Sequence, residues 1–347
     1  MCGIVAYIGL KPTKELLIEG LKRLEYRGYD SAGIAIMNGG VHVARTIGRV
    51  SGLEDIIAND DAFEGTVGIA HTRWATHGKP SESNAHPHSD DANTGHGIRV
   101  VHNGIIENYA TLKTYLKEKG HVFTSETDTE VLTHLIGEMY DGDLEKAVQT
   151  ALKEVTGAYA IAAICVKEPD VLVVARKGSP LIVGVGSDEY VVASDSSAIV
   201  AHTTQAFHLD DETVACLTRD SFRTTTMDNV ELTPEIRELE YSLEQIELGE
   251  FKHFMLKEIY EQPLTLSTCM KGRVDATSGQ VILGGVAEFA NELAKGKRML
   301  LLGQGTALHA AMIGEYLMES LAGIPAEVEY ASEFRYRNPI VEEGTIA

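Results

Sequence analysis

Apolar and polar positions follow two spacings over the first 230 residues, and each spacing predicts one type of element. Apolar-rich runs of strand length occupy 4–10, 31–37, 41–46, 65–74 and 98–106. Residues 13–28 instead place apolar side chains at helical spacing before a glycine, which predicts an amphipathic helix. The string NGG at 38–40 predicts a hairpin between the second and third runs.

The pattern changes from alternation to blocks after residue 125. Two amphipathic helices are predicted at 125–140 and 143–155. Six strand-like runs follow in succession, at 158–166, 171–178, 180–186, 190–195, 213–218 and 221–227. Strands in runs with helices in pairs predict an α+β layered domain with mainly antiparallel sheets.

Beyond residue 230 the chain becomes acidic and loses its strand pattern. We predict a first domain over 1–239, a linker over 240–250 and a second region over 251–347. In the second region, a helix is expected over 252–263, ended by Pro263. Residues 296–330 read as strand, glycine turn, helix and strand, which is a βαβ unit of a parallel sheet, and the last residues begin another strand.

Charge and cysteine usage restrict the possible partners. There are 51 acidic and 30 basic residues, for a formal net charge of −21, and this field disfavours nucleic acid. No apolar stretch approaches the roughly 20 residues that span a bilayer, so we expect no membrane partner. Cys2, Cys165, Cys216 and Cys269 are widely spaced. This favours a reduced, cytoplasmic setting, with the middle two cysteines as core packing.

Two strings carry candidate catalytic and binding residues, HTRWATHG at 71–78 and HNGIIEN at 102–108. Each follows an apolar strand, so we expect each to lie in a loop at the end of a sheet. Arg73 offers a planar fork for a carboxylate. Asn103 and Gly104 offer an amide and an unhindered backbone N–H, which is what an oxyanion hole requires. With Asp128 as an ammonium binder and Cys2 as a nucleophile, the set fits an α-amino acid with a reactive side-chain amide.

Each of these residues also has a plainer interpretation. Cys2 could be a small core residue at a strand start. The pair Asn103–Gly104 is also typical of a type I′ turn, and Arg73 with Asp128 could form a structural ion pair. Six histidines fall between 71 and 102. Their spacings match no zinc pattern, so we expect pocket walls or solvated loop residues and no metal.

Several ordered strings together carry a family resemblance: MCGIVAYIG, RLEYRGYDSAG, HTRWATHG, NAHPH, VHNGIIEN and SETDTE. They resemble the class II, N-terminal-nucleophile glutamine amidotransferases. Later strings, KEIYEQP, ESLAGIP and ASEFRYR, are similar to the branch that uses fructose 6-phosphate as acceptor. The resemblance implies a four-layer α/β/β/α glutaminase domain, followed by the incomplete start of an α/β sugar-isomerase (SIS) domain.

The resemblance also implies residue roles. Cys2, as the first residue after Met1 removal, would attack the glutamine carboxamide, and Asn103 and Gly104 would stabilise the oxyanion. Arg73 would bind the α-carboxylate and Asp128 the α-ammonium. The remaining implied residues are Thr76, His77 and His86 in the glutamine pocket, Trp74 as a gate for ammonia, and Thr306 at the sugar phosphate. The α-amine of Cys2 would serve as the base, with a pKa near ~7.7–8.0.

The acceptor side departs from the family pattern. The family usually reads Cys-Gly-Thr-Ser at the phosphate loop, whereas this chain has Gln304, Gly305, Thr306 and Ala307. The resemblance implies glutamine and fructose 6-phosphate as substrates, a homodimer for the full-length form, and no cofactor. Because the βαβ unit stops early, we expect this chain to hydrolyse glutamine without completing the sugar reaction. The alternatives are another phosphosugar acceptor, or a non-catalytic module that binds glutamine or sugar phosphate.

Overall fold

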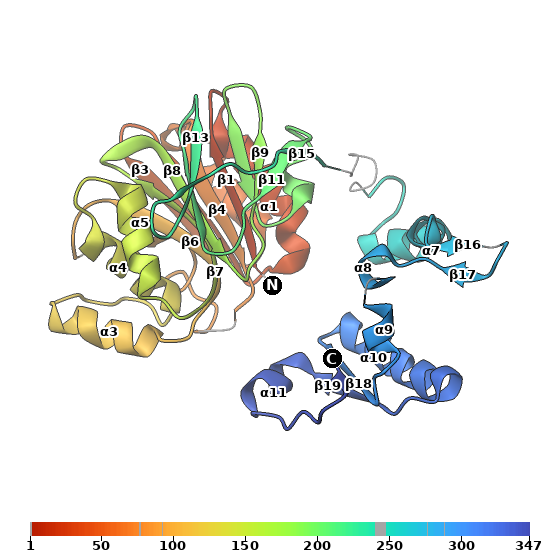
Figure 1. Ribbon diagram of the computed structural model, residues 1–347. Helices are drawn as coiled ribbons and strands as arrows, with labels where there is room; N and C mark the ends of the chain where they lie inside the picture. The colour runs from red at the N-terminus through yellow and green to blue at the C-terminus, as the bar shows by residue number, and fades with distance from the viewer. Residues whose placement is uncertain (1, 76–77, 92, 240–247, 276, 288) are drawn as a thin grey trace. The chain divides into compact units, whose positions relative to one another are not determined.

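The computed structural model of the chain describes residues 2–75, 78–91, 93–239, 248–275, 277–287 and 289–347 (Figure 1). It divides into two units, Met1–Gly249 and Glu250–Ala347. Most of the predicted linker, residues 240–247, lies outside the described residues, so the domain boundary stays a prediction.

Two antiparallel sheets form the centre of the first unit. The first has the order β15-β11-β9-β10-β1-β4-β2-β3. Its strands are β15 (Arg237–Glu238), β11 (Gln205–His208), β9 (Ile182–Val185), β10 (Tyr190–Ala193), β1 (Gly3–Ile8), β4 (Val67–Arg73), β2 (Ser31–Met37) and β3 (Val41–Ile47). The predicted hairpin is confirmed as β2–β3, and β1 lies in the middle of its sheet.

The second sheet has the order β14-β13-β12-β8-β7-β6-β5. Its strands are β14 (Glu231–Leu232), β13 (Phe222–Thr226), β12 (Thr213–Leu217), β8 (Glu168–Lys177), β7 (Gly157–Cys165), β6 (Ile98–Ile106) and β5 (His88–Ser89). Strand β6 runs through Asn103 and Gly104, which pair with Ala160 and Tyr159 of β7. The interpretation of this pair as a type I′ turn is therefore wrong. The expectation that HNGIIEN lies in a loop is also wrong for its first five residues, which belong to β6.

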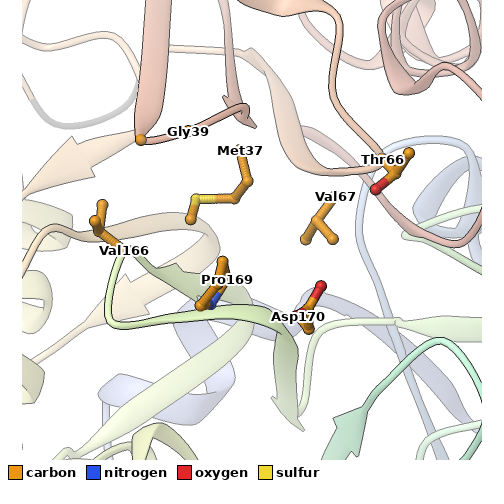
Figure 2. Close-up of a pocket in the computed structure, with 8 residues that line it drawn as sticks. Met37, Gly39, Thr66, Val67, Val166, Pro169 and Asp170 are labelled. Atoms are coloured by element: carbon orange, nitrogen blue, oxygen red, sulfur yellow. The ribbon is translucent and has the colours of Figure 1, made fainter.

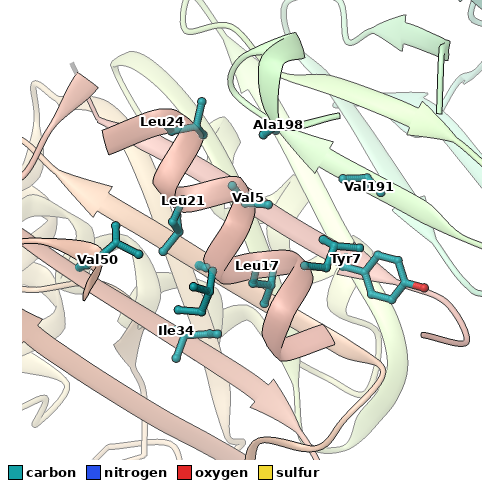
Figure 3. Close-up of a cluster of buried hydrophobic side chains, with 14 of the residues drawn as sticks. Val5, Tyr7, Leu17, Leu21, Leu24, Ile34, Val50, Val191 and Ala198 are labelled. Carbon is teal, nitrogen blue, oxygen red and sulfur yellow. The ribbon is translucent and has the colours of Figure 1, made fainter. Parts of the chain in front are cut away.

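Helices cover the outer faces of both sheets. The helices of this unit are α1 (Thr13–Leu24), α2 (Val50–Ile57), α3 (Tyr109–Glu118), α4 (Asp128–Met139) and α5 (Leu144–Lys153), with 3₁₀ turns η1 (Glu25–Arg27), η2 (Asp61–Phe63) and η3 (Ser196–Ala198). Leu17 and Leu21 of α1 pack on Val5 and Ile34 of the first sheet (Figure 3). The helices α3, α4 and α5 pack on the second sheet, and a third core lies between the sheets. This arrangement confirms the expected α+β fold with α/β/β/α layers.

The second unit contains a small parallel sheet of order β19-β18-β20. Its elements are α7 (Phe254–Met270), β16 (Val274–Asp275), β17 (Gln280–Val281), α8 (Gly284–Ala287), α9 (Ala290–Leu293), β18 (Arg298–Gly303), α10 (Thr306–Leu317), the π-helical turn η4 (Met318–Ala322), β19 (Ala326–Tyr330), α11 (Ala331–Tyr336) and β20 (Thr345–Ile346). The predicted βαβ unit is confirmed by the parallel pairing of β18 with β19.

One helix boundary in this unit was predicted wrongly. Helix α7 does not end at Pro263 but continues to Met270 with the proline inside it. A proline removes one backbone donor, and a helix passes through that position where the neighbouring turns keep their own hydrogen bonds. Among the described helices, none is both long and apolar enough to cross a membrane.

Candidate active site

Cys2 lies directly before β1, at the end of a central strand of the first sheet. Because β1 pairs with β4 from Gly3↔Thr72 onward, the start of β1 lies beside the end of β4. The Trp74 N–H donates to Cys2 Sγ at 3.3 Å, and the thiol donates to the Trp74 carbonyl oxygen at 3.6 Å. The nucleophile expected from the sequence is thus held against the segment that follows Arg73.

Asn103 reaches the same place from the second sheet. Its Nδ2 donates to the backbone carbonyl oxygen of Cys2 at 3.2 Å. The next residue, Gly104, has a φ of +133°, and a Cβ built there would lie 2.0 Å from the carbonyl oxygen of Ala158. Only glycine fits this close approach of β6 to β7, so the backbone N–H beside Asn103 depends on Gly104.

Two charged side chains are buried near the thiol. Arg73 ends β4 with 4% of its surface exposed and donates from Nη2 to the Gly78 carbonyl oxygen at 3.2 Å. Asp128 begins α4 with 6% exposed, and its Oδ2 accepts a hydrogen bond from the Ile106 N–H at 2.8 Å. The site therefore offers one buried cation and one buried anion, as binding of a zwitterionic amino acid requires.

A single small cavity of about 30 Å³ connects these groups. Its lining consists of Cys2, Arg73, Trp74, His86, His102, Gly104, Thr127, Asp128 and Thr129. Most of the residues that the sequence singled out come together here. Thr76 and His77 lie outside the described residues, and Thr306 belongs to the second unit, where it begins α10.

The string YRGYD holds the loop that carries Trp74, a role that the sequence motif did not reveal. The Asp30 N–H donates to the Arg73 carbonyl oxygen at 3.0 Å, and the Asp30 carboxylate accepts from the Ala75 N–H at 2.8 Å. A Cβ at Gly28 would lie 2.7 Å from the Trp74 nitrogen. The YRGYD string therefore shapes the segment that contacts the thiol. Its connection to HTRWATHG depends on the contact between the two segments in the folded chain, which the sequence alone does not show.

The histidines divide into two groups. Four histidines are buried around the site: His71, His86, His88 and His102. His96 lies elsewhere and interacts with Lys167. Burial lowers the pKa of His71 to about 3 and holds the pKa values of His86 and His88 well below the ordinary range. Within the described part of the chain, no group of three or more histidine, cysteine or acidic side chains is arranged to hold a metal ion.

Burial also raises the pKa of the Cys2 thiol, although the Trp74 N–H and the Arg73 guanidinium partly offset this effect. The thiol therefore needs a base before it can attack a substrate, since the thiolate is the nucleophilic form. The other cysteines, Cys165, Cys216 and Cys269, are free as well. Cys165 is buried in the core beneath α4 and α5, and the partly buried Cys216 packs against this core. The interpretation of both cysteines as core packing is therefore confirmed.

A larger cavity of about 350 Å³ lies at the other end of the strands (Figure 2). Val67 and Met37 line it, and these residues pair with each other at the opposite end of β4 and β2 from Arg73. Val67 and Arg73 are six residues apart along β4, so the two cavities are separated by about 20 Å along the strand. The lining of the larger cavity contains no cysteine, histidine or basic residue, so the chemistry is concentrated at Cys2.

Comparisons with known proteins agree with this geometry. A family described as "Glutamine amidotransferase domain" matches residues 58–250, and one described as "SIS domain" matches residues 292–347. Over its whole length the chain is 51% identical to a protein of Chlorobaculum tepidum and 49% identical to one of Bacteroides thetaiotaomicron, both named glutamine--fructose-6-phosphate aminotransferase (isomerizing). The chain spans 57% of the length of each relative.

A solved structure is similar to about two thirds of the chain. The structure titled the allosteric regulatory enzyme of purine biosynthesis has a TM-score of 0.58 at 26% identity. The match covers 65% of this chain and 49% of that chain.

Proposed function

The chain belongs to the glutamine amidotransferase family, and from that premise we propose that it hydrolyses glutamine to glutamate and ammonia with Cys2 as the nucleophile. One observation carries the proposal. Cys2, Arg73, Asn103, Gly104 and Asp128 lie on segments far apart in the sequence, yet they converge on one place in the first unit. This convergence supports catalysis over the alternative of a non-catalytic binding module.

The proposed reaction begins at the thiol. Cys2 Sγ attacks the carbon of the glutamine carboxamide, and the negative charge that forms on the oxygen is stabilised by Asn103 Nδ2 and the Gly104 N–H. Ammonia leaves, and water then hydrolyses the γ-glutamyl thioester. The thioester divides one difficult step into two easier ones.

The α-amine of Cys2 is the proposed base once Met1 has been removed. The thiol pKa is raised by burial, whereas an α-amine has a pKa near ~7.7–8.0. Such an amine can accept the thiol proton and return it to the departing ammonia near neutral pH. An amine still joined to Met1 is an amide and cannot do this.

Arg73 and Asp128 hold the amino-acid end of glutamine in this scheme. The guanidinium pairs with the α-carboxylate, and the carboxylate of Asp128 pairs with the α-ammonium. The Ile106 N–H fixes the Asp128 carboxylate, so the anion does not need to reorganise when substrate binds. His86 forms part of the pocket wall. We further assign Thr76 and His77 to the glutamine pocket and Trp74 to gating of ammonia.

Fructose 6-phosphate is the proposed acceptor of the ammonia in the full-length protein, with a homodimer as its assembly and glucosamine 6-phosphate as its product. The names of the two relatives support this acceptor. Thr306 begins α10 directly after Gly305, and a helix N-terminus attracts phosphate. A reduced compartment such as the cytoplasm suits an enzyme whose nucleophile is a free thiol.

Steady-state glutaminase kinetics on Asn103→Ala, Arg73→Ala and Asp128→Ala test the division of roles. Asn103→Ala should lower kcat by ~10²–10³-fold with little change in KM. Arg73→Ala and Asp128→Ala should mainly raise KM, because they remove uniform binding. Asn38→Ala and Arg49→Ala, at exposed positions that do not line the cavity around Cys2, serve as controls. The same kinetic change in all three site variants would contradict the assignment.

A further inference from the structure

Strand β6 remains paired with β7 through Ile106 but loses its other neighbour, β5, before it reaches the active site. Strand β5 pairs with β6 at His88↔Val100 and Ser89↔Arg99. At His102, two side chains take over this edge: the His102 N–H donates to His86 Nδ1 at 3.3 Å, and the His102 carbonyl oxygen accepts from His71 Nε2 at 3.1 Å. Two imidazoles thus satisfy the backbone groups that a longer β5 would have paired.

The surroundings of His71 determine where its ring carries a proton. Its Nε2 lies 3.0 Å from Asn103 Oδ1 and 3.1 Å from the His102 carbonyl oxygen. Both partners are acceptors, so Nε2 must be the donor. The His71 Nδ1 is buried and has no hydrogen-bond partner in the described structure. The ring is therefore neutral, which agrees with its low pKa.

A neutral ring also fits its neighbour. The His71 and His86 rings are stacked with centroids 4.1 Å apart. His86 accepts the His102 N–H at Nδ1, so its own proton belongs on Nε2. Two charged imidazoles at this separation would repel each other strongly in a buried site. The stack consequently holds His71 with its N–H pointed at Asn103.

We propose that His71 is a positioning residue that turns the Asn103 carboxamide so that its N–H, and not its oxygen, faces Cys2. The inference rests on the proposed function, because it supplies the orientation that the oxyanion hole needs. His71 Nε2–H donates to Asn103 Oδ1, and Asn103 Nδ2 then donates to the Cys2 carbonyl oxygen.

The opposite orientation of the amide is strongly disfavoured. Rotating the carboxamide by half a turn would place Asn103 Nδ2–H against His71 Nε2–H and Asn103 Oδ1 against the carbonyl oxygen of Cys2. Both hydrogen bonds would be replaced by contacts between like partners, and buried polar groups without a partner are costly. Without His71, only the bond to the Cys2 carbonyl oxygen would oppose the exchange of N–H for oxygen beside Cys2.

A double-mutant cycle tests the proposal. His71→Leu should lower kcat for glutamine hydrolysis by ~10²-fold, as expected for loss of one oxyanion donor, with KM close to wild type. His71→Leu combined with Asn103→Ala should be no slower than Asn103→Ala alone, because residues that act as a unit are non-additive. His71→Gln places an amide N–H near the imidazole Nε2 and should restore most of kcat.

Alkylation by iodoacetamide separates positioning from a general loss of structure. The reaction is followed on the peptide that contains Cys2, because Cys269 is exposed and also free. This displacement develops no oxyanion, so its rate at Cys2 should match wild type in His71→Leu and in Asn103→Ala. His42→Leu is the matched control. It also removes a histidine bonded to a backbone carbonyl oxygen and packed on another ring, on β3 away from the cavity.

The outcomes distinguish this inference from the function on which it rests. If the wild-type chain with a mature Cys2 shows no glutaminase activity, the proposed function fails. The positioning role is overturned if wild type is active but His71→Leu keeps full kcat. It is also overturned if the fall in kcat of the double variant equals the product of the falls in the two single variants. Slow alkylation together with slow hydrolysis in His71→Leu would also overturn it, by assigning His71 to general support of the fold.

Discussion

Replacing Gly104 with alanine perturbs catalysis and sheet packing at one point. Gly104 pairs with Tyr159 of β7 and has a φ of +133°, a region that other residues rarely adopt. The alanine Cβ would lie 2.0 Å from the Ala158 carbonyl oxygen. Carbon and oxygen need more than about 3 Å, and the obstacle is backbone, so β6 and β7 must separate by roughly 1 Å.

Two costs add for this variant. The unfavourable backbone conformation costs about 1–3 kcal/mol, and the separation of two paired strands adds about 1–3 kcal/mol by analogy with overpacking in a core. A total of about 2–6 kcal/mol corresponds to a fall in Tm of roughly 4–24 °C for a unit of this size. Since the Gly104 N–H moves away from the proposed oxyanion position, kcat should fall by at least ~10²-fold.

Thermal unfolding and steady-state glutaminase kinetics measure the two effects. Gly142→Ala is the matched control, because Gly142 has a φ of +110° and an added Cβ would meet no atom within 4 Å. That control carries the conformational cost alone and should keep full kcat. The reasoning is refuted if Gly104→Ala has the same Tm and the same kcat as Gly142→Ala.

Three further variants or conditions test other parts of the account. Asp30→Ala removes the acceptor of the Ala75 N–H and should lower kcat/KM for glutamine by ~10–10²-fold, the range expected for one hydrogen bond to a charged group. Unchanged kinetics would show that the loop carrying Trp74 keeps its conformation without Asp30. Glu130→Gln disrupts a carboxylate that accepts two backbone and two hydroxyl hydrogen bonds and should cost about 2–3 kcal/mol in urea unfolding. The pKa of His71 is about 3 when folded, against ~6.5 unfolded, so its contribution to stability is complete above pH ~6.5 and is lost as the pH falls toward 3, by up to ~1.4 kcal/mol per pH unit. Urea midpoints between pH 8 and 5 should therefore fall less steeply in His71→Gln than in wild type.

Much of the fold follows from the spacing of apolar residues. The runs that became β1, β2, β4 and β7 are long, apolar and strand-like, so their periodicity was sufficient to identify them. Short or atypical elements escaped this reasoning. Strand β5 has two residues and α2 has eight, which is too short for a clear pattern in isolation. Helix α3 is as long as the predicted α5, but it buries only Leu112 and Leu116, so its apolar face is narrow.

The sequence identified most residues of the site one by one, but it did not predict the hydrogen bonds and strand pairing that bring them together. The polar step at Asn103–Gly104 looked like the end of a strand, because glycine usually interrupts pairing. Here the positive φ of Gly104 lets β6 approach Ala158 and remain paired. Asp30 and His71 gave no signal of their own. Their roles depend on hydrogen bonds to residues 45 and 32 positions away along the chain, which spacing does not reveal.

The most direct test of the central claim is peptide mapping of the covalent intermediate. The chain is mixed with glutamine, quenched in acid within the first turnovers and digested, and the peptides are analysed by mass spectrometry. The account predicts a γ-glutamyl thioester on Cys2 in a peptide that begins at Cys2. An adduct on Cys165, Cys216 or Cys269, or glutamine turnover by a chain in which Met1 is retained, would contradict it.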